Sequence, residues 1–121
     1  MQKFRYFSPK TVSEAVLTLS QLDGTAKVLA GGTDLLPMMK QRAITPGSIV
    51  NIKNITELAY IREDADGLKI GAMTTIADIK ESDIIKQKCV SLYEAARKFG
   101  TPVVRNMATI GGNICRSSPS A

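Results

Sequence analysis

The stretch Lys27-Val28-Leu29-Ala30-Gly31-Gly32-Thr33-Asp34 decides how the first half of the chain folds. Its first four residues read as a short buried strand, the glycine pair as the turn after that strand, and Thr33-Asp34 as the cap of a helix through Lys40. Pro37 falls in the first turn of this helix, where a missing N–H costs little. Such a junction exposes backbone N–H groups at the positive end of a helix, where a phosphate binds well.

A helix and a second strand flank this junction. Thr11-Val12-Ser13-Glu14 is a capping box, and apolar residues follow it at helical spacing as far as Leu22. Beyond the loop Thr45-Pro46-Gly47, the run from Ser48 to Ile52 reads as a strand. The first fifty or so residues therefore predict helix, strand, helix, strand, which is a small α/β unit.

The second half of the chain has a different pattern. Leu58 to Arg62 and Leu68 to Met73 predict two strands of a hairpin around Asp64-Ala65-Asp66-Gly67. Thr74-Thr75 opens a short helix, and a longer helix with Leu92, Ala95, Ala96 and Phe99 on one face ends at Gly100, with Pro102 blocking its continuation. Residues 103–121 read as loop and strand.

A second glycine pair lies in Ala108-Thr109-Ile110-Gly111-Gly112-Asn113-Ile114. Asn113 tolerates a left-handed backbone and offers an amide to a ligand. Each pair also has a purely structural interpretation: a turn between strand and helix for the first, and a bulge or tight strand bend for the second. Two such segments in one small domain favour a ligand, because a pyrophosphate can be held from both sides.

Composition narrows the class of protein. A chain of 121 residues is enough for one compact domain or for two small layers that share a core. The net charge of +5 fits either an ordinary basic surface or a face that meets cofactor phosphates or an acidic partner. Scattered cations and few aromatic residues argue against nucleic-acid binding. Without a membrane-length apolar run or a signal peptide, a cytoplasmic location is the default expectation.

The chain has no histidine, and its two cysteines, Cys89 and Cys115, form no C-x-x-C pair. It therefore lacks the commonest general base, and no zinc or iron–sulfur site can be built from this chain alone. We expect both cysteines to be small buried hydrophobes. We also expect no catalytic side chain, so that a bound cofactor carries any chemistry.

The two glycine segments together resemble a known pair of flavin motifs. Lys27 to Asp34 resembles the first flavin motif of xanthine dehydrogenase and carbon monoxide dehydrogenase flavoprotein subunits, and Arg105 to Ile114 resembles their T-I-G-G-N motif. The spacing between them and the opening Phe4-x-Tyr6-x-x-Pro9 match as well. The chain thus resembles the N-terminal part of the FAD-binding (medium) subunit of molybdenum hydroxylases.

This resemblance implies an α+β chain with the vanillyl-alcohol-oxidase (PCMH) type of FAD-binding fold. Residues 1–55 would form the small α/β subdomain, residues 56–121 would begin a second, incomplete α+β subdomain, and FAD would lie between them. The implied FAD-binding residues fall in the two motifs, along an adenine–ribityl path, and near the flavin. They are Lys27, Val28, Leu29, Ala30, Gly31, Gly32, Thr33, Asp34, Gly100, Val104, Ala108, Thr109, Ile110, Gly111, Gly112, Asn113, Arg116 and Ser120.

The resemblance also implies an electron-transfer role. In the family, a large molybdopterin subunit hydroxylates the substrate, and [2Fe–2S] clusters on a small subunit pass electrons to FAD, which reduces NAD⁺ or another acceptor. The family's flavin subunit is much longer than this chain, so we expect an inactive fragment. Two alternatives stay open: a non-redox nucleotide- or phosphate-binding module, and an assembly piece without flavin.

Overall fold

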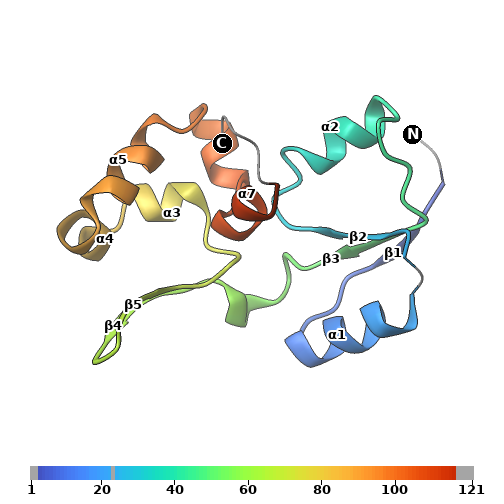
Figure 1. The fold of residues 1–121 in the computed structure, drawn as a ribbon, viewed down its shortest axis with the longest axis horizontal. Helices are drawn as coiled ribbons and strands as arrows, with labels where there is room; N and C mark the ends of the chain where they lie inside the picture. The colour runs from blue at the N-terminus through green and yellow to red at the C-terminus, as the bar shows by residue number, and fades with distance from the viewer. Residues whose placement is uncertain (1–2, 23, 117–121) are drawn as a thin grey trace. The chain divides into compact units, whose positions relative to one another are not determined.

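Three parallel strands organise the first half of the molecule (Figure 1). They are β1 (Arg5–Phe7), β2 (Ala26–Leu29) and β3 (Ser48–Asn51), and they pair in the order β1-β3-β2. The computed structural model describes residues 3–22 and 24–116. The chain divides into two compact units, Met1–Glu57 and Leu58–Ala121.

The two helices of the first unit cover opposite faces of this sheet, as Figure 1 shows. Helix α1 (Val12–Gln21) is capped by Thr11, whose Oγ1 accepts a hydrogen bond from the Glu14 N–H at 3.1 Å. Helix α2 (Leu35–Lys40) packs its Met39 against Leu29 and Ile49 in a buried cluster. The predicted helices and strands of this half are confirmed, and the central strand β3 is buried along its whole length.

Strand β1 was not predicted from the sequence. It has only three residues, and Arg5 and Tyr6 are exposed because β1 is an edge strand. What makes it a strand is its pairing with β3, in which Arg5 lies opposite Ser48 and Phe7 opposite Val50. The first unit is therefore strand, helix, strand, helix, strand, with one strand more than the sequence indicated.

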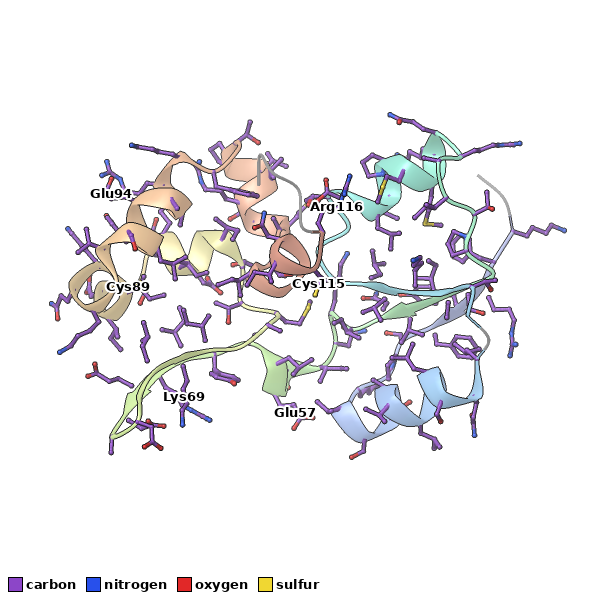
Figure 2. The ribbon with its side chains drawn as sticks, viewed as in Figure 1. Glu57, Lys69, Cys89, Glu94, Cys115 and Arg116 are labelled. Atoms are coloured by element: carbon purple, nitrogen blue, oxygen red, sulfur yellow. The ribbon has the colours of Figure 1, made fainter. Side chains whose placement is uncertain are left out.

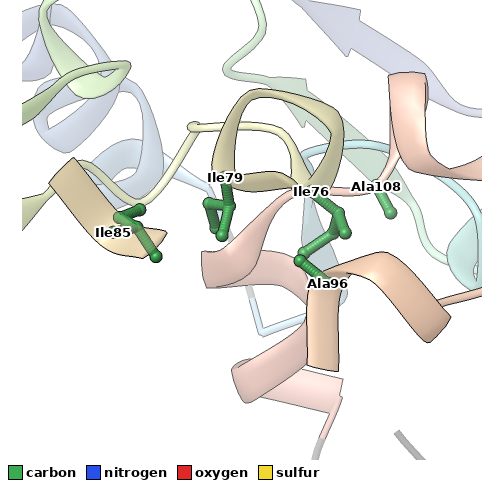
Figure 3. Packing of buried hydrophobic residues seen from close by; sticks show 5 residues of the cluster. All are labelled: Ile76, Ile79, Ile85, Ala96 and Ala108. Carbon is green, nitrogen blue, oxygen red and sulfur yellow. The ribbon is translucent and has the colours of Figure 1, made fainter. Parts of the chain in front are cut away.

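The second unit begins with the predicted hairpin, formed by β4 (Ile61–Asp64) and β5 (Gly67–Ile70). Its strands are antiparallel and shifted by a few residues from the predicted ranges. Helices α3 (Ile76–Lys80), α4 (Asp83–Lys88) and α5 (Val90–Lys98) follow. Apolar residues of these helices and Ala108, further along the chain, form a buried core, shown in Figure 3, whose members are Ile76, Ile79, Ile85, Ala96 and Ala108.

The prediction of loop and strand after residue 102 was wrong, because this stretch forms α6 (Pro102–Met107) and α7 (Ile110–Arg116). Pro102 stands in the first turn of α6, where its fixed φ suits a helix, and Thr101 caps this helix through the Val104 N–H at 3.3 Å. Thr109 caps α7 in the same way, because its Oγ1 accepts a hydrogen bond from the Gly112 N–H at 3.1 Å. Within the described residues, no helix is long and apolar enough to cross a membrane.

Candidate functional site

The first glycine segment joins the carboxyl end of β2 to α2. Gly32 has a φ of +81°, a left-handed conformation that glycine adopts readily and other residues rarely do. The Gly32 carbonyl accepts a hydrogen bond from the Leu36 N–H at 3.1 Å. A Cβ at Gly32 would lie 3.0 Å from Leu36 Cδ1 and 3.1 Å from Leu29 Cδ1. This turn therefore needs glycine at position 32.

Four consecutive main-chain N–H groups of this turn have no hydrogen-bond acceptor in the described chain. No hydrogen bond within residues 3–22 and 24–116 uses the N–H of Gly31, Gly32, Thr33 or Asp34 as its donor. Asp34 is the N-cap residue of α2, as predicted, but its side chain makes no capping hydrogen bond. Since most backbone N–H groups in folded proteins have a partner, four consecutive N–H groups without an acceptor, next to a left-handed glycine, are a candidate anion site.

Side-chain hydrogen bonds connect the residues and loops at the carboxyl edge of the sheet. Asn51 Nδ2 donates to the Tyr6 hydroxyl at 2.7 Å, and Asn51 Oδ1 accepts from the Lys53 N–H at 2.9 Å. Asn54 Nδ2 donates to Ser8 Oγ at 2.8 Å. Because the three strands are parallel, their carboxyl ends and the loops that follow share one edge with the glycine turn. The sequence analysis missed Asn51, although a polar residue ending the buried run Ile49-Val50 was a usable signal.

Charged side chains of both signs occur in the strands and loops of the first unit. Glu57 accepts the Val12 N–H at 2.9 Å and Glu14 accepts the Lys10 N–H at 3.1 Å, so both carboxylates are engaged at the start of α1. Lys10, Lys27 and Lys53 form no ion pair with any described residue. These two carboxylates therefore bind backbone amides, whereas the three lysines and the carboxylate of Asp34 in the turn itself have no ion-pair partner among the described residues.

The second glycine segment is not a loop, a bulge or a strand bend, but the first turn of α7. Four of its main-chain amides, Ile110 to Asn113, have acceptors in the chain, whereas the Thr109 N–H donates to no described residue. Ile110 N donates to Thr74 O at 3.0 Å and Gly111 N to Ala72 O at 2.8 Å. Gly112 N donates to Thr109 Oγ1 at 3.1 Å and Asn113 N to Thr109 O at 3.0 Å. The two glycine segments thus differ in the property that matters for anion binding.

The other residues implied by the resemblance lie around α6 and α7. Gly100 has a φ of +50° in the turn before α6, Val104 lies within α6, and Ala108 follows it with 3% of its surface exposed. Arg105 fixes that turn by donating to the carbonyl oxygens that precede α6. Arg116 is exposed at the end of α7 (Figure 2), and Ser120 lies outside the described residues.

The expectation that both cysteines are buried holds in part for one of the two. Cys89 is half-buried and packs against the core of the second unit. Cys115 is exposed on α7, so the prediction that it is a buried hydrophobe was wrong (Figure 2). Its place in α7 explains the difference, because this helix buries none of its residues.

A glycine turn whose amides lack acceptors, at the carboxyl edge of parallel strands, is an arrangement in which α/β domains bind phosphate groups. The family of FAD-binding domains in molybdopterin dehydrogenases matches residues 2–121. The chain is 46% identical over 117 residues to the carbon monoxide dehydrogenase medium chain of Hydrogenophaga pseudoflava, and 38% identical over 117 residues to the xanthine dehydrogenase FAD-binding subunit of Escherichia coli O157:H7. These alignments cover 97% and 96% of the chain.

Solved structures agree with the sequence relatives. Carbon monoxide dehydrogenase from Hydrogenophaga pseudoflava, in a form that lacks the Mo-pyranopterin moiety of its cofactor, matches with a TM-score of 0.94 over 98% of the chain and at 46% identity. The chain belongs to the family of FAD-binding domains of molybdopterin dehydrogenases. It spans about 40% of the length of these relatives: 41% of the medium chain and 40% of the xanthine dehydrogenase subunit.

Proposed function

We propose that this chain holds FAD for a molybdenum hydroxylase and that the turn Gly31 to Asp34 binds the FAD pyrophosphate. The observation that carries the proposal is the run of four open main-chain amides at this turn. Two phosphate groups need several N–H donors that are already in place, and these amides supply them without rearrangement. The left-handed Gly32 holds the turn in a backbone conformation that other residues rarely adopt.

In this proposal the chain has the vanillyl-alcohol-oxidase (PCMH) type of FAD-binding fold. The lysines near the carboxyl edge add positive charge to the phosphate site, and the residues of the second unit meet the rest of the cofactor. Those residues include Gly100, Val104, Ala108, Thr109, Asn113 and Arg116 of the described chain. Their contribution is binding and orientation rather than acid–base chemistry, because the chain has no histidine.

The proposed role of the whole subunit is electron transfer. Bound FAD would supply the redox chemistry, between [2Fe–2S] clusters of a small partner subunit and NAD⁺ or another acceptor. The molybdenum centre would lie on a large partner subunit. Relatives are named for carbon monoxide, xanthine and nicotinate, and such variety fits a subunit that does not select the substrate.

The proposal is tested by flavin retention. The purified chain is mixed with FAD, free cofactor is removed by gel filtration, and flavin absorption and fluorescence are recorded. We expect retained FAD, displacement by ADP only at much higher concentration, and loss of retention in Gly32→Val. Gly24→Val is the matched control, because a Cβ at Gly24 meets nothing within 4 Å.

Two results would contradict this function. A chain that is folded by circular dichroism but retains no FAD would favour the assembly piece without flavin. Equal affinity for FAD, ADP and inorganic pyrophosphate would favour the non-redox phosphate-binding module, since nothing beyond the phosphates would then contribute to binding.

A further inference from the structure

The segment that precedes α3 is held on both of its edges by main-chain hydrogen bonds. On one edge, Gly71 N donates to Tyr60 O at 2.8 Å and Met73 N donates to Leu58 O at 2.9 Å. On the other edge, this segment meets the start of α7. There the acceptors are Thr74 O and Ala72 O, the donors are the first two amides of α7, and Thr75 forms a bridge with Thr109. The segment therefore has little freedom to move away from α7.

Gly111 stands at the closest approach between these two segments. A Cβ at Gly111 would lie 2.7 Å from Ala72 O and 2.8 Å from Ala72 Cβ. Carbon atoms do not approach backbone this closely, so one of the two segments would have to shift. Because the Ala72 segment is also held on its far edge, the start of α7 is the part that would move. Glycine at 111 is therefore a requirement of packing inside the chain.

The first turn of α7 has no amide left for a ligand. The N–H groups of Ile110, Gly111, Gly112 and Asn113 all have acceptors in the chain, at 2.8 to 3.1 Å. A phosphate could use them only if these hydrogen bonds were broken. Side-chain groups remain: the Thr109 hydroxyl proton and the Asn113 amide, for which no hydrogen bond is present among the described residues.

We propose that Gly111 is a positioning residue of the FAD site and not a ligand of FAD. It seats α7 against Ala72, and the seated helix presents the Thr109 and Asn113 side chains to the cofactor. Main-chain amides for the pyrophosphate then come from Gly31 to Asp34, and next to α7 only the Thr109 N–H lacks an acceptor among the described residues. The inference rests on the proposed FAD function, but the hydrogen bonding of Gly111 is a property of the chain without ligand.

Amide hydrogen exchange separates the two kinds of amide. In ¹H–¹⁵N spectra of the whole chain without FAD, we expect slow exchange at Gly111 and Ile110 and fast exchange at Gly31 to Asp34. Addition of FAD should create protection at Gly31 to Asp34, whereas Gly111 should already be protected in the free chain. A Gly111 amide that exchanges fast in the free chain and slows only with FAD would overturn the inference. Absence of any FAD effect at Gly31 to Asp34 would contradict the proposed function, while Gly111 in the free chain still tests its hydrogen bond to Ala72.

Substitution tests the positioning role. Gly111→Ala should raise the FAD dissociation constant at least tenfold and change the visible circular dichroism of bound flavin, whereas Gly24→Ala should change neither. Adding Ala72→Gly removes the 2.8 Å contact and should restore part of the affinity. This rescue also decides the case in which Gly111→Ala alone is unfolded. Parental affinity in Gly111→Ala, or no recovery in a folded double variant, would overturn the inference.

Asn113→Ala supplies an independent check, because it removes a proposed contact with FAD and leaves the contact between Gly111 and Ala72 unchanged. We expect weaker FAD binding and an unchanged exchange rate at Gly111. Unchanged FAD affinity in this variant would contradict the part that the inference assigns to the Asn113 side chain.

Discussion

Replacing Gly32 with alanine perturbs the fold and the proposed phosphate site through one backbone conformation. Gly32 has a φ of +81°, and a left-handed conformation costs an L-residue about 1–2 kcal/mol. The new Cβ also meets two leucine methyl groups at 3.0 and 3.1 Å, but these are side-chain ends that can yield. We therefore expect a loss of about 1–2 kcal/mol in the free energy of unfolding, which lowers the melting temperature of a domain this small by roughly 5–10 °C.

The same substitution should weaken FAD binding by more than the loss of stability explains. If the turn relaxes toward a negative φ, the amides of Gly31 to Asp34 no longer point at one anion. Losing a single hydrogen bond to a charged group costs about 1.5–3 kcal/mol. Since about 1.4 kcal/mol is a factor of ten, the FAD dissociation constant should rise about ten- to a hundredfold.

Two other glycines provide matched controls. Gly67 has a φ of +125° with nothing within 4 Å of its Cβ position, and Gly24 is also open but has no positive φ to strain. Gly67→Ala should lower stability and leave FAD affinity unchanged, and Gly24→Ala should lower neither. Thermal melts and fluorescence titration measure both effects. The reasoning is refuted if Gly32→Ala is as stable as the parent, or if it weakens FAD binding no more than Gly67→Ala does.

Three further substitutions test the second unit. The buried Thr74 hydroxyl accepts from the Tyr60 N–H at 3.1 Å and donates to the Tyr60 C=O at 2.9 Å, and Thr74→Val removes both hydrogen bonds. Urea unfolding should show a loss of about 2–4 kcal/mol in the free energy of unfolding. An unchanged unfolding midpoint would contradict this. The pKa of Asp64 lies below its ordinary value of 3.8, chiefly because Lys69 hydrogen-bonds it, so the stability from this carboxylate is present above that pH and lost as the pH falls. Lys69→Met should raise the pKa in an NMR titration, and an unmoved pKa would count against the contact. Arg105→Met removes two hydrogen bonds, at 3.1 and 3.2 Å, to carbonyl oxygens of the turn before α6. The same urea assay should show a loss of about 1.5–3 kcal/mol in the free energy of unfolding. An unchanged midpoint would mean that the two contacts contribute nothing.

The first unit could be predicted well because its signals are local. The Thr11 cap, the apolar spacing behind it and the glycine turn after Leu29 each act within a few residues, and the structure has the expected elements there. Strand β1 could not be found in this way. Its three residues are a strand because of pairing with β3, which is more than forty positions away in the chain.

The second glycine segment was misread for a related reason. Each glycine in a helix costs about 1 kcal/mol relative to alanine, so two in succession argue against a helix when only local preference is considered. The helix α7 forms because Thr109 caps it and because Ala72 and Thr74 accept its first amides. Those acceptors lie more than thirty positions earlier, and no local pattern around Gly111 indicates them.

The two glycine pairs are alike in sequence and opposite in their backbone partners. At Gly31-Gly32 the amides have no acceptor in the described chain, and the left-handed turn holds them open. At Gly111-Gly112 the amides are satisfied, and the missing Cβ admits a neighbouring carbonyl instead of a ligand. A glycine pair in a sequence therefore indicates only that the backbone must come close to something. Whether that is a phosphate or another part of the same chain depends on where the N–H groups find their acceptors, and that is a property of the fold.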